Sequence, residues 1–285
     1  MTVLPSPPRP SPHDPIAIAL AEDIGPGDLT SKYFVGDESR RARIVAREAA
    51  VVAGAETAAE VFTRVDPRLV VKVALPSGSR VASGATVIEI SGTASSILTA
   101  ERVALNFLQR LSGVATLTRR YVDAVAPHRA RILDTRKTTP GLRSLEKGAV
   151  LAGGGLNHRF GLFDMVMVKD NHLAARRDPA ALQAAITRFR AEKPGLRVEV
   201  EADTLDQVRE FLGLTGIDVI LLDNMPCADM AEAVHLGAGR VQLEASGGVT
   251  LESVPQIAAT GVDFISVGAL THSARAIDFS LELES

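Results

Sequence analysis

The residues best suited to chemistry follow two short apolar runs in the middle of the chain. Ile132–Leu133 leads into Asp134–Lys137, and Met165–Val168 leads into Lys169–His172. Three consecutive glycines and an Asn-His-Arg sequence lie between the two runs. Any one of the cations here would be read as a surface residue, but a domain does not need five of them beside glycines and strand ends in order to fold. We interpret five residues as a pocket for a small ligand with several negative charges: Arg136, Lys137, His158, Arg159 and Lys169.

The composition indicates a globular protein that acts on small molecules. The chain has 285 residues, 46% of them hydrophobic and 23% charged, which is enough for one large domain or two ordinary ones. A net charge of -3 and an aromatic fraction of 4% argue against nucleic-acid binding. The single Cys227 excludes an internal disulfide and favours a reducing compartment. No apolar run has the length of a membrane span and the first residues lack a signal core, so we expect a cytoplasmic protein without a membrane partner.

The first half of the chain has the pattern of a β-rich module with helices. Residues 1–15 are rich in Pro and Ser and predict a disordered arm, which ends where Asp14 and Pro15 are suited to begin a helix. Strands are expected within residues 42–54, 69–74 and 87–90, and a helix over 55–64 with Ala58, Val61 and Phe62 facing inward. A long helix is expected over about 95–124, with Gly113 as a candidate point for a kink or break.

After Pro127 apolar runs alternate with helical segments. The predicted strands are Arg131–Leu133, Met165–Val168, Arg197–Val200, Asp218–Leu222, Arg240–Leu243 and Asp263–Val267. The predicted helices are Pro179–Glu192, Leu205–Leu212, Ala228–Leu236 and Leu251–Ala259. Such alternation is typical of parallel strands joined by helical crossovers. The chain has no G-x-G-x-x-G after the first of these strands and no Walker P-loop, and six strands are fewer than a full (β/α)₈ barrel needs, so we expect an incomplete barrel.

In barrels the active site lies at the carboxyl ends of the strands. Glu201 and Asp223 end neighbouring predicted strands, where they could hold Mg²⁺ through water, accept hydrogen bonds from sugar hydroxyls, or neutralise the nearby cations. Ser246–Gly248 suits a phosphate, because glycine lets the backbone approach an oxyanion closely. Lys169 at a strand end has a rival interpretation as an imine-forming nucleophile, as in barrel aldolases. These residues predict a barrel enzyme with a phosphorylated, anionic ligand and leave the reaction open.

Seven ordered motifs resemble the quinolinate phosphoribosyltransferase family, also called nicotinate-nucleotide pyrophosphorylase (carboxylating). The resemblance extends from about Ala19 to the C-terminus and includes the turn from Asp23 to Thr30. The motifs are Glu101–Asn106, Asp134–Thr138, Gly153–Arg159, Lys169–His172, Glu199–Glu201, Leu222–Asn224 and Glu244–Gly248.

The resemblance implies a fold, a reaction and an assembly. It implies an N-terminal α/β sandwich domain over residues 16–125, to which the tail 273–285 returns, and an incomplete, seven-stranded α/β barrel over 126–272. In the implied reaction, quinolinate and phosphoribosyl pyrophosphate, with Mg²⁺, give nicotinate mononucleotide, pyrophosphate and CO₂ in NAD synthesis. The implied assembly is a homodimer or higher homo-oligomer with shared active sites.

The resemblance also assigns roles to individual residues. Lys137, Lys169, Glu201 and Asp223 are expected to be catalytic, and the last two to bind the ribose hydroxyls and Mg²⁺, directly or through water. The quinolinate carboxylates are expected to contact Arg136, His158, Arg159 and Lys169, with Arg102 entering from the partner subunit. Lys137 is expected near the pyrophosphate. The remaining expected substrate contacts are Thr135, Ser246, Gly247, Gly248, Val267, Gly268, Ala269 and His272.

Two positions depart from the family pattern, and the residues also fit three different hypotheses. Gly148 stands where the family often has Tyr, and Leu151 where it often has Arg. The run from Ala149 to Gly155 is similar to a molybdenum-transport-associated family as well, although that family lacks the Asn-His-Arg and Lys-Asp-Asn-His motifs. A non-catalytic barrel that binds a phosphorylated ligand is a further hypothesis, and so is an aldolase-type barrel that uses Lys169.

Overall fold

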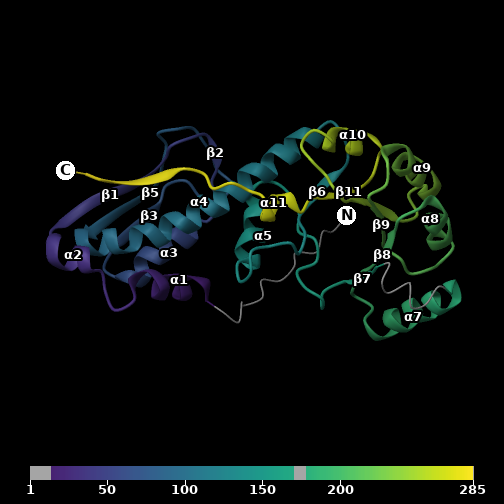
Figure 1. The fold of residues 1–285 in the computed structure, drawn as a ribbon, viewed down its shortest axis with the longest axis horizontal. Coiled ribbons are helices and arrows are strands. Elements are labelled where there is room, and N and C mark those ends of the chain that lie inside the picture. The colour runs from purple at the N-terminus through teal and green to yellow at the C-terminus, as the bar shows by residue number, and fades with distance from the viewer. Residues whose placement is uncertain (1–13, 170–177, 285) are drawn as a thin grey trace. The chain divides into compact units, whose positions relative to one another are not determined.

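The structure, a computed structural model, describes residues 14–169 and 178–284, which belong to two compact units (Figure 1). The first unit comprises Met1–Leu117, Thr138–Gly154 and Thr271–Ser285, and the second comprises Thr118–Lys137 and Gly155–Leu270. Residues 1–13 of the predicted arm and the predicted motif residues Asp170, Asn171 and His172 lie outside the described residues.

The first unit is an antiparallel sheet with helices. Its strands are β1 (Ser39–Ala46), β2 (Ala50–Val51), β3 (Val70–Val73), β4 (Arg80–Val81), β5 (Thr86–Thr93) and β12 (Phe279–Leu283). Its helices are α1 (Pro15–Ile24), α2 (Leu29–Phe34), α3 (Ala55–Val65), α5 (Arg143–Ala152) and the first part of α4 (Ala94–Val125). Four strands pair in the order β12-β1-β5-β3, while β2 pairs with β4, and α3 packs on β3 and β5 (Figure 1).

Local sequence signals account for most of these elements. The Asp14 carboxylate accepts hydrogen bonds from the N–H groups of Ile16 and Ala17, both at 3.1 Å, so the predicted helix start is confirmed. The inward face predicted for the helix over 55–64 is confirmed too, since Ala58, Val61 and Phe62 are fully buried in α3. The Gly-Pro-Gly turn ends in Asp28, which caps α2 through the Ser31 N–H and accepts a hydrogen bond from Thr99 of α4. This turn therefore ties α2 to α4.

Gly113 does not break α4, which is one continuous helix, so the expected division at this residue is wrong. The reason for glycine lies in the C-terminal tail. A Cβ at Gly113 would lie 2.0 Å from the carbonyl oxygen of Arg275. Glycine is required here because the tail backbone passes directly against the helix.

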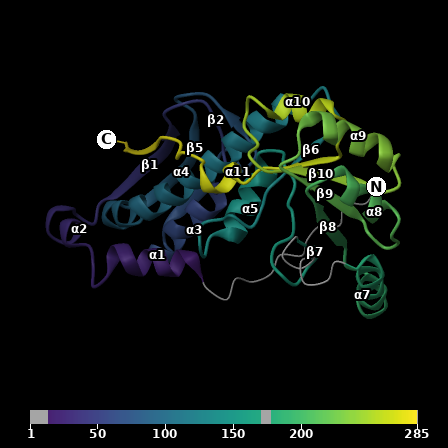
Figure 2. The same cartoon turned by 45° about the vertical axis from the view of Figure 1, so that its right-hand side comes forward.

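The second unit is a parallel α/β sheet, so the expected α/β fold class is confirmed. Its strands are β6 (Arg131–Leu133), β7 (Val166–Val168), β8 (Val198–Ala202), β9 (Val219–Asp223), β10 (Gln242–Ser246) and β11 (Phe264–Ser266). Its helices include α7 (Pro179–Glu192), α8 (Leu205–Leu212), α9 (Cys227–Gly237) and α10 (Val254–Ala259), and α11 (Ala269–His272) begins in it. The strands pair in the order β6-β11-β10-β9-β8-β7, and α8, α9 and α10 contact β8, β10 and β11 respectively. Figure 2 labels the neighbouring strands β10, β9, β8 and β7 of this sheet.

The described parallel sheet has six strands, where the resemblance implied seven. Leu156 adds a single parallel bridge to Leu133, at the edge of β6 that no other described strand covers. The six predicted strands are all present, and two predicted helices, Pro179–Glu192 and Leu205–Leu212, have the predicted bounds. Their ends are set by caps: Asp178 accepts from the Ala180 N–H, and Thr204 forms a capping box with Gln207. None of the described helices has the length and hydropathy to cross a membrane.

Candidate active site

The predicted site residues of the second unit lie at the carboxyl ends of its parallel strands. Because β6 to β11 run parallel and are hydrogen-bonded side by side, these ends share one edge of the sheet. The residues within or just after these strand ends are Thr135, Arg136, Lys137, Lys169, Glu201, Asp223, Ser246, Gly247, Gly248, Val267, Gly268 and Ala269. Barrel and sheet enzymes bind their ligands at such an edge.

Lys169 and Glu201 form an ion pair at this edge. Val168 of β7 pairs with Val200 of β8, so the two following side chains start from adjacent positions. The Lys169 Nζ lies 2.6 Å from Glu201 Oε2, with the lysine side chain 43% exposed and the glutamate 8% exposed. An imine-forming lysine needs a desolvated pocket or a second cation beside it. This half-exposed ammonium instead contacts a carboxylate, which argues against the aldolase hypothesis.

Glu201 of this ion pair also belongs to a group of three carboxylates. Oxygens of Glu201, Asp203 and Asp223 all lie within 4.8 Å of one another. The structure thus brings together the two predicted acidic residues, and it adds Asp203, to which sequence reasoning assigned no role. Its signal was its position two residues after Glu201, just past the end of β8. Carboxylate oxygens at this spacing fit Mg²⁺, which prefers one or two carboxylates together with water and phosphate oxygens.

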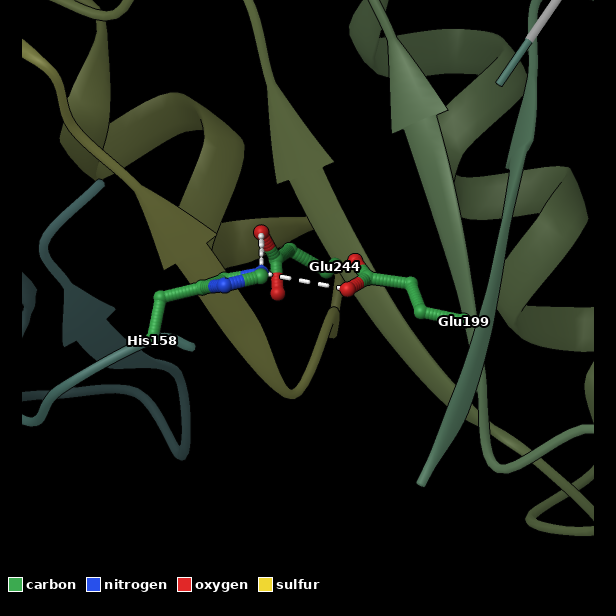
Figure 3. A group of neighbouring side chains, drawn as sticks. All are labelled: His158, Glu199 and Glu244. Atoms are coloured by element: carbon green, nitrogen blue, oxygen red, sulfur yellow. Dashed lines mark ion pairs between the residues drawn. The ribbon is translucent and has the colours of Figure 1, made fainter. Parts of the chain in front are cut away.

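A second charged cluster is buried among the strands and joins His158 to Glu199 and Glu244 (Figure 3). His158 Nε2 lies 3.1 Å from Glu199 Oε2 and 3.4 Å from Glu244 Oε1. The imidazole is 7% exposed and the two carboxylates 0% and 2%. Both oxygens of Glu199 and Oε1 of Glu244 are buried without a well-formed hydrogen bond to the described residues. Two carboxylates this close and this deeply buried oppose each other's ionisation. Burial, and then the negative charge of Glu244, raise the pKa of Glu199.

The imidazole of His158 supplies a proton to this cluster. Burial alone would lower its pKa, but the two carboxylates outweigh burial and raise the pKa to about 10. Nδ1 accepts a hydrogen bond from the Arg159 N–H at 2.7 Å, an interaction that favours the neutral ring and opposes this rise. Because Nδ1 is an acceptor, the neutral ring would carry its proton on Nε2. Nε2 therefore carries a proton directed at the carboxylates in the neutral ring and in the charged ring alike. A metal ion on Nε2 would have to displace that proton, so we interpret the cluster as proton-bridged.

Asp134 holds this segment in place. Its side chain is fully buried, and Oδ1 accepts a hydrogen bond from the His158 N–H at 2.8 Å. The backbone N–H of Asp134 donates to Leu156 O at 3.1 Å. Sequence reasoning placed Asp134, Glu199 and Glu244 within motifs but assigned them no site role. The alternation of β8, which puts Glu199 and Glu201 on one face, was the available signal for Glu199.

Two guanidinium groups from the chain between β6 and β7, those of Arg136 and Arg159, lie near each other. Burial, and then the positive charge of Arg136, lower the pKa of Arg159. The Arg159 Nη2 donates to the Met167 sulfur at 3.3 Å, and no carboxylate of the described residues forms an ion pair with this guanidinium. Like charges held together in a partly buried place are stabilised by an anion. Lys137 is exposed nearby in sequence, its N–H donating to Thr135 Oγ1 at 3.0 Å.

The glycine turn after β10 lies beside the end of β9. Ser246 pairs with Asp223 in the sheet register. Gly247 and Gly248 follow with φ of +97° and +58°, the left-handed region that favours glycine, and both are exposed. This turn can bring backbone N–H groups to an oxyanion. After β11, Val267 is buried and donates its N–H to Leu133 O at 2.9 Å, while Gly268 and Ala269 are partly exposed.

Two predicted contacts belong to the first unit. Arg102 is exposed on α4, and His272 is the exposed last residue of α11, with Nδ1 2.6 Å from Ser273 Oγ.

The strand edge of the second unit carries two kinds of charged group. Guanidinium groups come from the chain between β6 and β7, and carboxylates with a glycine turn follow β8, β9 and β10. Guanidinium groups are suited to carboxylates, whereas carboxylates with a glycine turn are suited to hydroxyls, a cation and phosphate. An edge of this kind is that of an α/β enzyme that brings two anionic small molecules together.

Comparison with known proteins identifies the family within this class. The profile of the quinolinate phosphoribosyl transferase N-terminal domain matches residues 28–112, and that of the C-terminal domain matches residues 114–282. This chain therefore belongs to the quinolinate phosphoribosyltransferase family, a family of decarboxylating phosphoribosyltransferases, as its motifs predicted.

Relatives and solved structures agree with this assignment. The chain is 44% identical to a probable nicotinate-nucleotide pyrophosphorylase [carboxylating] from Bacillus subtilis, over 92% of this chain and 90% of the relative. It is 45% identical to quinolinate phosphoribosyltransferase [decarboxylating] 1b from Nicotiana tabacum, over 95% and 81%. The nicotinate-nucleotide pyrophosphorylase structure from Francisella tularensis superposes with a TM-score of 0.88 at 39% identity, covering 94% of each chain. The fold and the enzyme class of this chain follow from these matches.

Proposed function

We propose that this protein transfers the phosphoribosyl group of phosphoribosyl pyrophosphate to quinolinate and releases CO₂, forming nicotinate mononucleotide and pyrophosphate for NAD synthesis. The observation that carries the proposal is the pair of neighbouring guanidinium groups, Arg136 and Arg159, on the scaffold of the family. Quinolinate has two adjacent carboxylates, and guanidinium forks bind carboxylates through paired hydrogen bonds.

The cationic residues of the strand edge would bind quinolinate. Arg136 and Arg159 would each contact a carboxylate, and Lys169 would add a third cation after exchanging part of its contact with Glu201. His158 would complete this wall of the pocket, oriented by Glu199 and Glu244. Burial of the like-charged arginines favours a dianion over a neutral ring, which gives the site its specificity.

The carboxylates of the strand edge would bind the sugar and a divalent cation. Glu201 and Asp223, joined by Asp203, would hold Mg²⁺ and accept hydrogen bonds from the ribose hydroxyls. The Mg²⁺ ion supplies charge neutralisation for the departing pyrophosphate, and Lys137 would support it. The glycine turn Ser246–Gly248, together with Gly268 and Ala269, would hold the 5′-phosphate through backbone N–H groups.

The protein's own groups would then act on the charges that develop. As the bond between ribose C1 and pyrophosphate breaks, positive charge grows on the sugar, and the carboxylates of Glu201 and Asp223 stabilise it. The quinolinate nitrogen forms the new bond to C1 and becomes a pyridinium. Loss of CO₂ leaves an electron pair at C2 of that ring, which the adjacent cationic nitrogen stabilises before a proton is taken up. No covalent bond to the protein is needed.

We also propose that the protein assembles as a homodimer or higher homo-oligomer in which Arg102 of one subunit contributes to the site of its partner. The exposure of Arg102 on α4 is compatible with this role. A cytoplasmic location is proposed from the single cysteine, which suits a reducing compartment.

The test is a reaction of the purified protein with quinolinate, phosphoribosyl pyrophosphate and Mg²⁺, in which nicotinate mononucleotide and CO₂ are followed together. We expect the two products in equal amounts, and none after chelation of Mg²⁺. Product from nicotinate but not from quinolinate would contradict the assignment of the dicarboxylate pocket. Binding of phosphoribosyl pyrophosphate without any turnover would instead favour the hypothesis of a non-catalytic barrel.

A further inference from the structure

Asn224, the first residue after β9, has an unusual backbone conformation. Its φ is +52°, in the left-handed region, and among the described non-glycine residues only Ala238, with φ of +45°, shares this feature. Asparagine tolerates this region better than most residues do, at a cost that persists only where surrounding contacts fix it. The contacts of Asn224 are therefore informative.

Three contacts of Asn224 link the ends of β9 and β10. Its side-chain Nδ2 donates to Asp223 Oδ2 at 2.7 Å, and its backbone N–H donates to Ser246 O at 2.9 Å. Its Oδ1 occupies the space that a side chain at Gly247 would need, since a Cβ there would lie 2.1 Å from this oxygen. One residue thus contacts both the acidic group at the end of β9 and the glycine turn after β10.

We propose that Asn224 is a positioning residue that orients the Asp223 carboxylate and the Ser246–Gly248 turn together, so that the sugar and phosphate of phosphoribosyl pyrophosphate are recognised as one unit. The amide occupies Oδ2 of Asp223, which leaves Oδ1 to meet the ligand. The same amide lies where a side chain at Gly247 would be. Glycine is therefore needed at this position for two reasons, the space that Asn224 occupies and the φ of +97°. The identity of the ligand in this inference rests on the proposed function. The link that Asn224 makes between Asp223 and the glycine turn does not.

Two variants separate the side chain of Asn224 from its backbone. Asn224→Gly keeps the left-handed conformation without strain and removes the amide. Asn224→Asp keeps the size but replaces the donor with a second carboxylate against Asp223. The matched control is Ala238→Gly, which relieves the same backbone conformation at the exposed end of α9.

The readout is the KM of each substrate in initial-rate assays. A hydrogen bond to a carboxylate contributes enough that its loss raises KM for phosphoribosyl pyrophosphate about tenfold or more in both Asn224 variants. KM for quinolinate should stay unchanged, and Ala238→Gly should match the wild type in both. The proposal is overturned if Asn224→Gly behaves like the wild type, if Asn224→Asp does, or if both KM values rise equally.

A second measurement tests the linkage itself and does not depend on the reaction. Gly247→Ala places a methyl group against Asn224 Oδ1 and puts alanine at a φ of +97°, and the two effects together should lower the folding equilibrium constant about tenfold or more in urea titrations. In the Asn224→Gly background the same change should cost clearly less, because the opposing atoms are gone. Equal costs in the two backgrounds would overturn the linkage. A wild type that shows this coupling but does not use quinolinate would refute the proposed function alone.

Discussion

Gly113 and Gly148 are both glycines inside helices, yet replacing them with alanine should have opposite effects on stability. Gly113 lies in α4, where an added Cβ would be 2.0 Å from Arg275 O and 3.4 Å from the Cα of Ala276. Gly148 lies in α5, where no atom comes within 4 Å of an added Cβ. Both substitutions gain the same helix propensity, so the difference between them isolates the contact with the tail.

The magnitude follows from how little the tail can move. On one side of Arg275, Ala274 O accepts from Arg110 Nη1 at 2.8 Å, and on the other, the Ile277 N–H donates to Gln109 O at 3.1 Å. Both partners are on α4, so the tail cannot move away from Gly113 without losing these bonds. Overpacking costs about 1–3 kcal/mol, and a clash at 2.0 Å with a backbone oxygen belongs to the upper part of this range, about 2–3 kcal/mol, against about 1 kcal/mol gained from alanine in a helix. We expect Gly113→Ala to lose about 1–2 kcal/mol and Gly148→Ala to gain about 0.5–1 kcal/mol.

The assay is urea unfolding of the two variants and the wild type, with the midpoints compared at a common slope. A midpoint for Gly113→Ala below the wild type and one for Gly148→Ala above it would support the reasoning. Gly113→Ala at or above the wild-type midpoint would refute it, because the tail would then be free to move away. A changed slope would indicate that the transition is no longer two-state, and the midpoints would then not report one free energy of unfolding.

Three further predictions concern charge. Arg159→Lys keeps the charge but loses the guanidinium fork, so KM for quinolinate should rise at least about tenfold while KM for phosphoribosyl pyrophosphate stays constant, with the exposed Arg209→Lys on α8 as a control in the same rate assay. His158 has a pKa raised from 6.5 to about 10, so the native state keeps a proton that the unfolded chain releases. The free energy of unfolding should therefore fall as pH rises from 6.5 toward 10, and His158→Gln should show a flatter profile in urea titrations across this range. Glu48 has a pKa lowered to about 2, chiefly by its hydrogen bond to the Arg275 side chain, so its contribution to stability is present above pH 4.5 and lost as pH falls toward 2. Acid titration followed by circular dichroism should find less of that loss in Glu48→Gln, and identical acid profiles would contradict the assignment.

The elements that the sequence predicted well are those whose signals are local. The helix Pro179–Glu192 has a cap, a proline at its start and two buried residues one turn apart, Leu182 and Ile186, and each signal lies within a few residues of its effect. The same holds for the residues at strand ends, because a strand end can be read from one apolar run. Glu201 and Asp223 could therefore be assigned to one site before their proximity was known.

The features that could not be predicted depend on contacts between distant segments. The buried cluster of His158, Glu199 and Glu244 joins residues from three places in the chain, and each glutamate alone would be read as a polar strand residue. The reason for Gly113 had no local signal either, because the atom that excludes a side chain there belongs to Arg275. Asn224 is similar, since neither the conformation of its backbone nor its contact with Gly247 has a local sequence signal.

The pairing of β12 with β1 has a consequence for synthesis of the protein. Arg43 on β1 bonds Glu282 on β12 across 239 residues of chain, and β1 lies between β12 and β5 in the sheet. Until β12 has been translated and has left the ribosome, one edge of β1 has no partner. An unpaired strand edge is a site for association between chains. The sheet of the first unit is thus begun early in translation and is closed only after the strands of the second unit have been made.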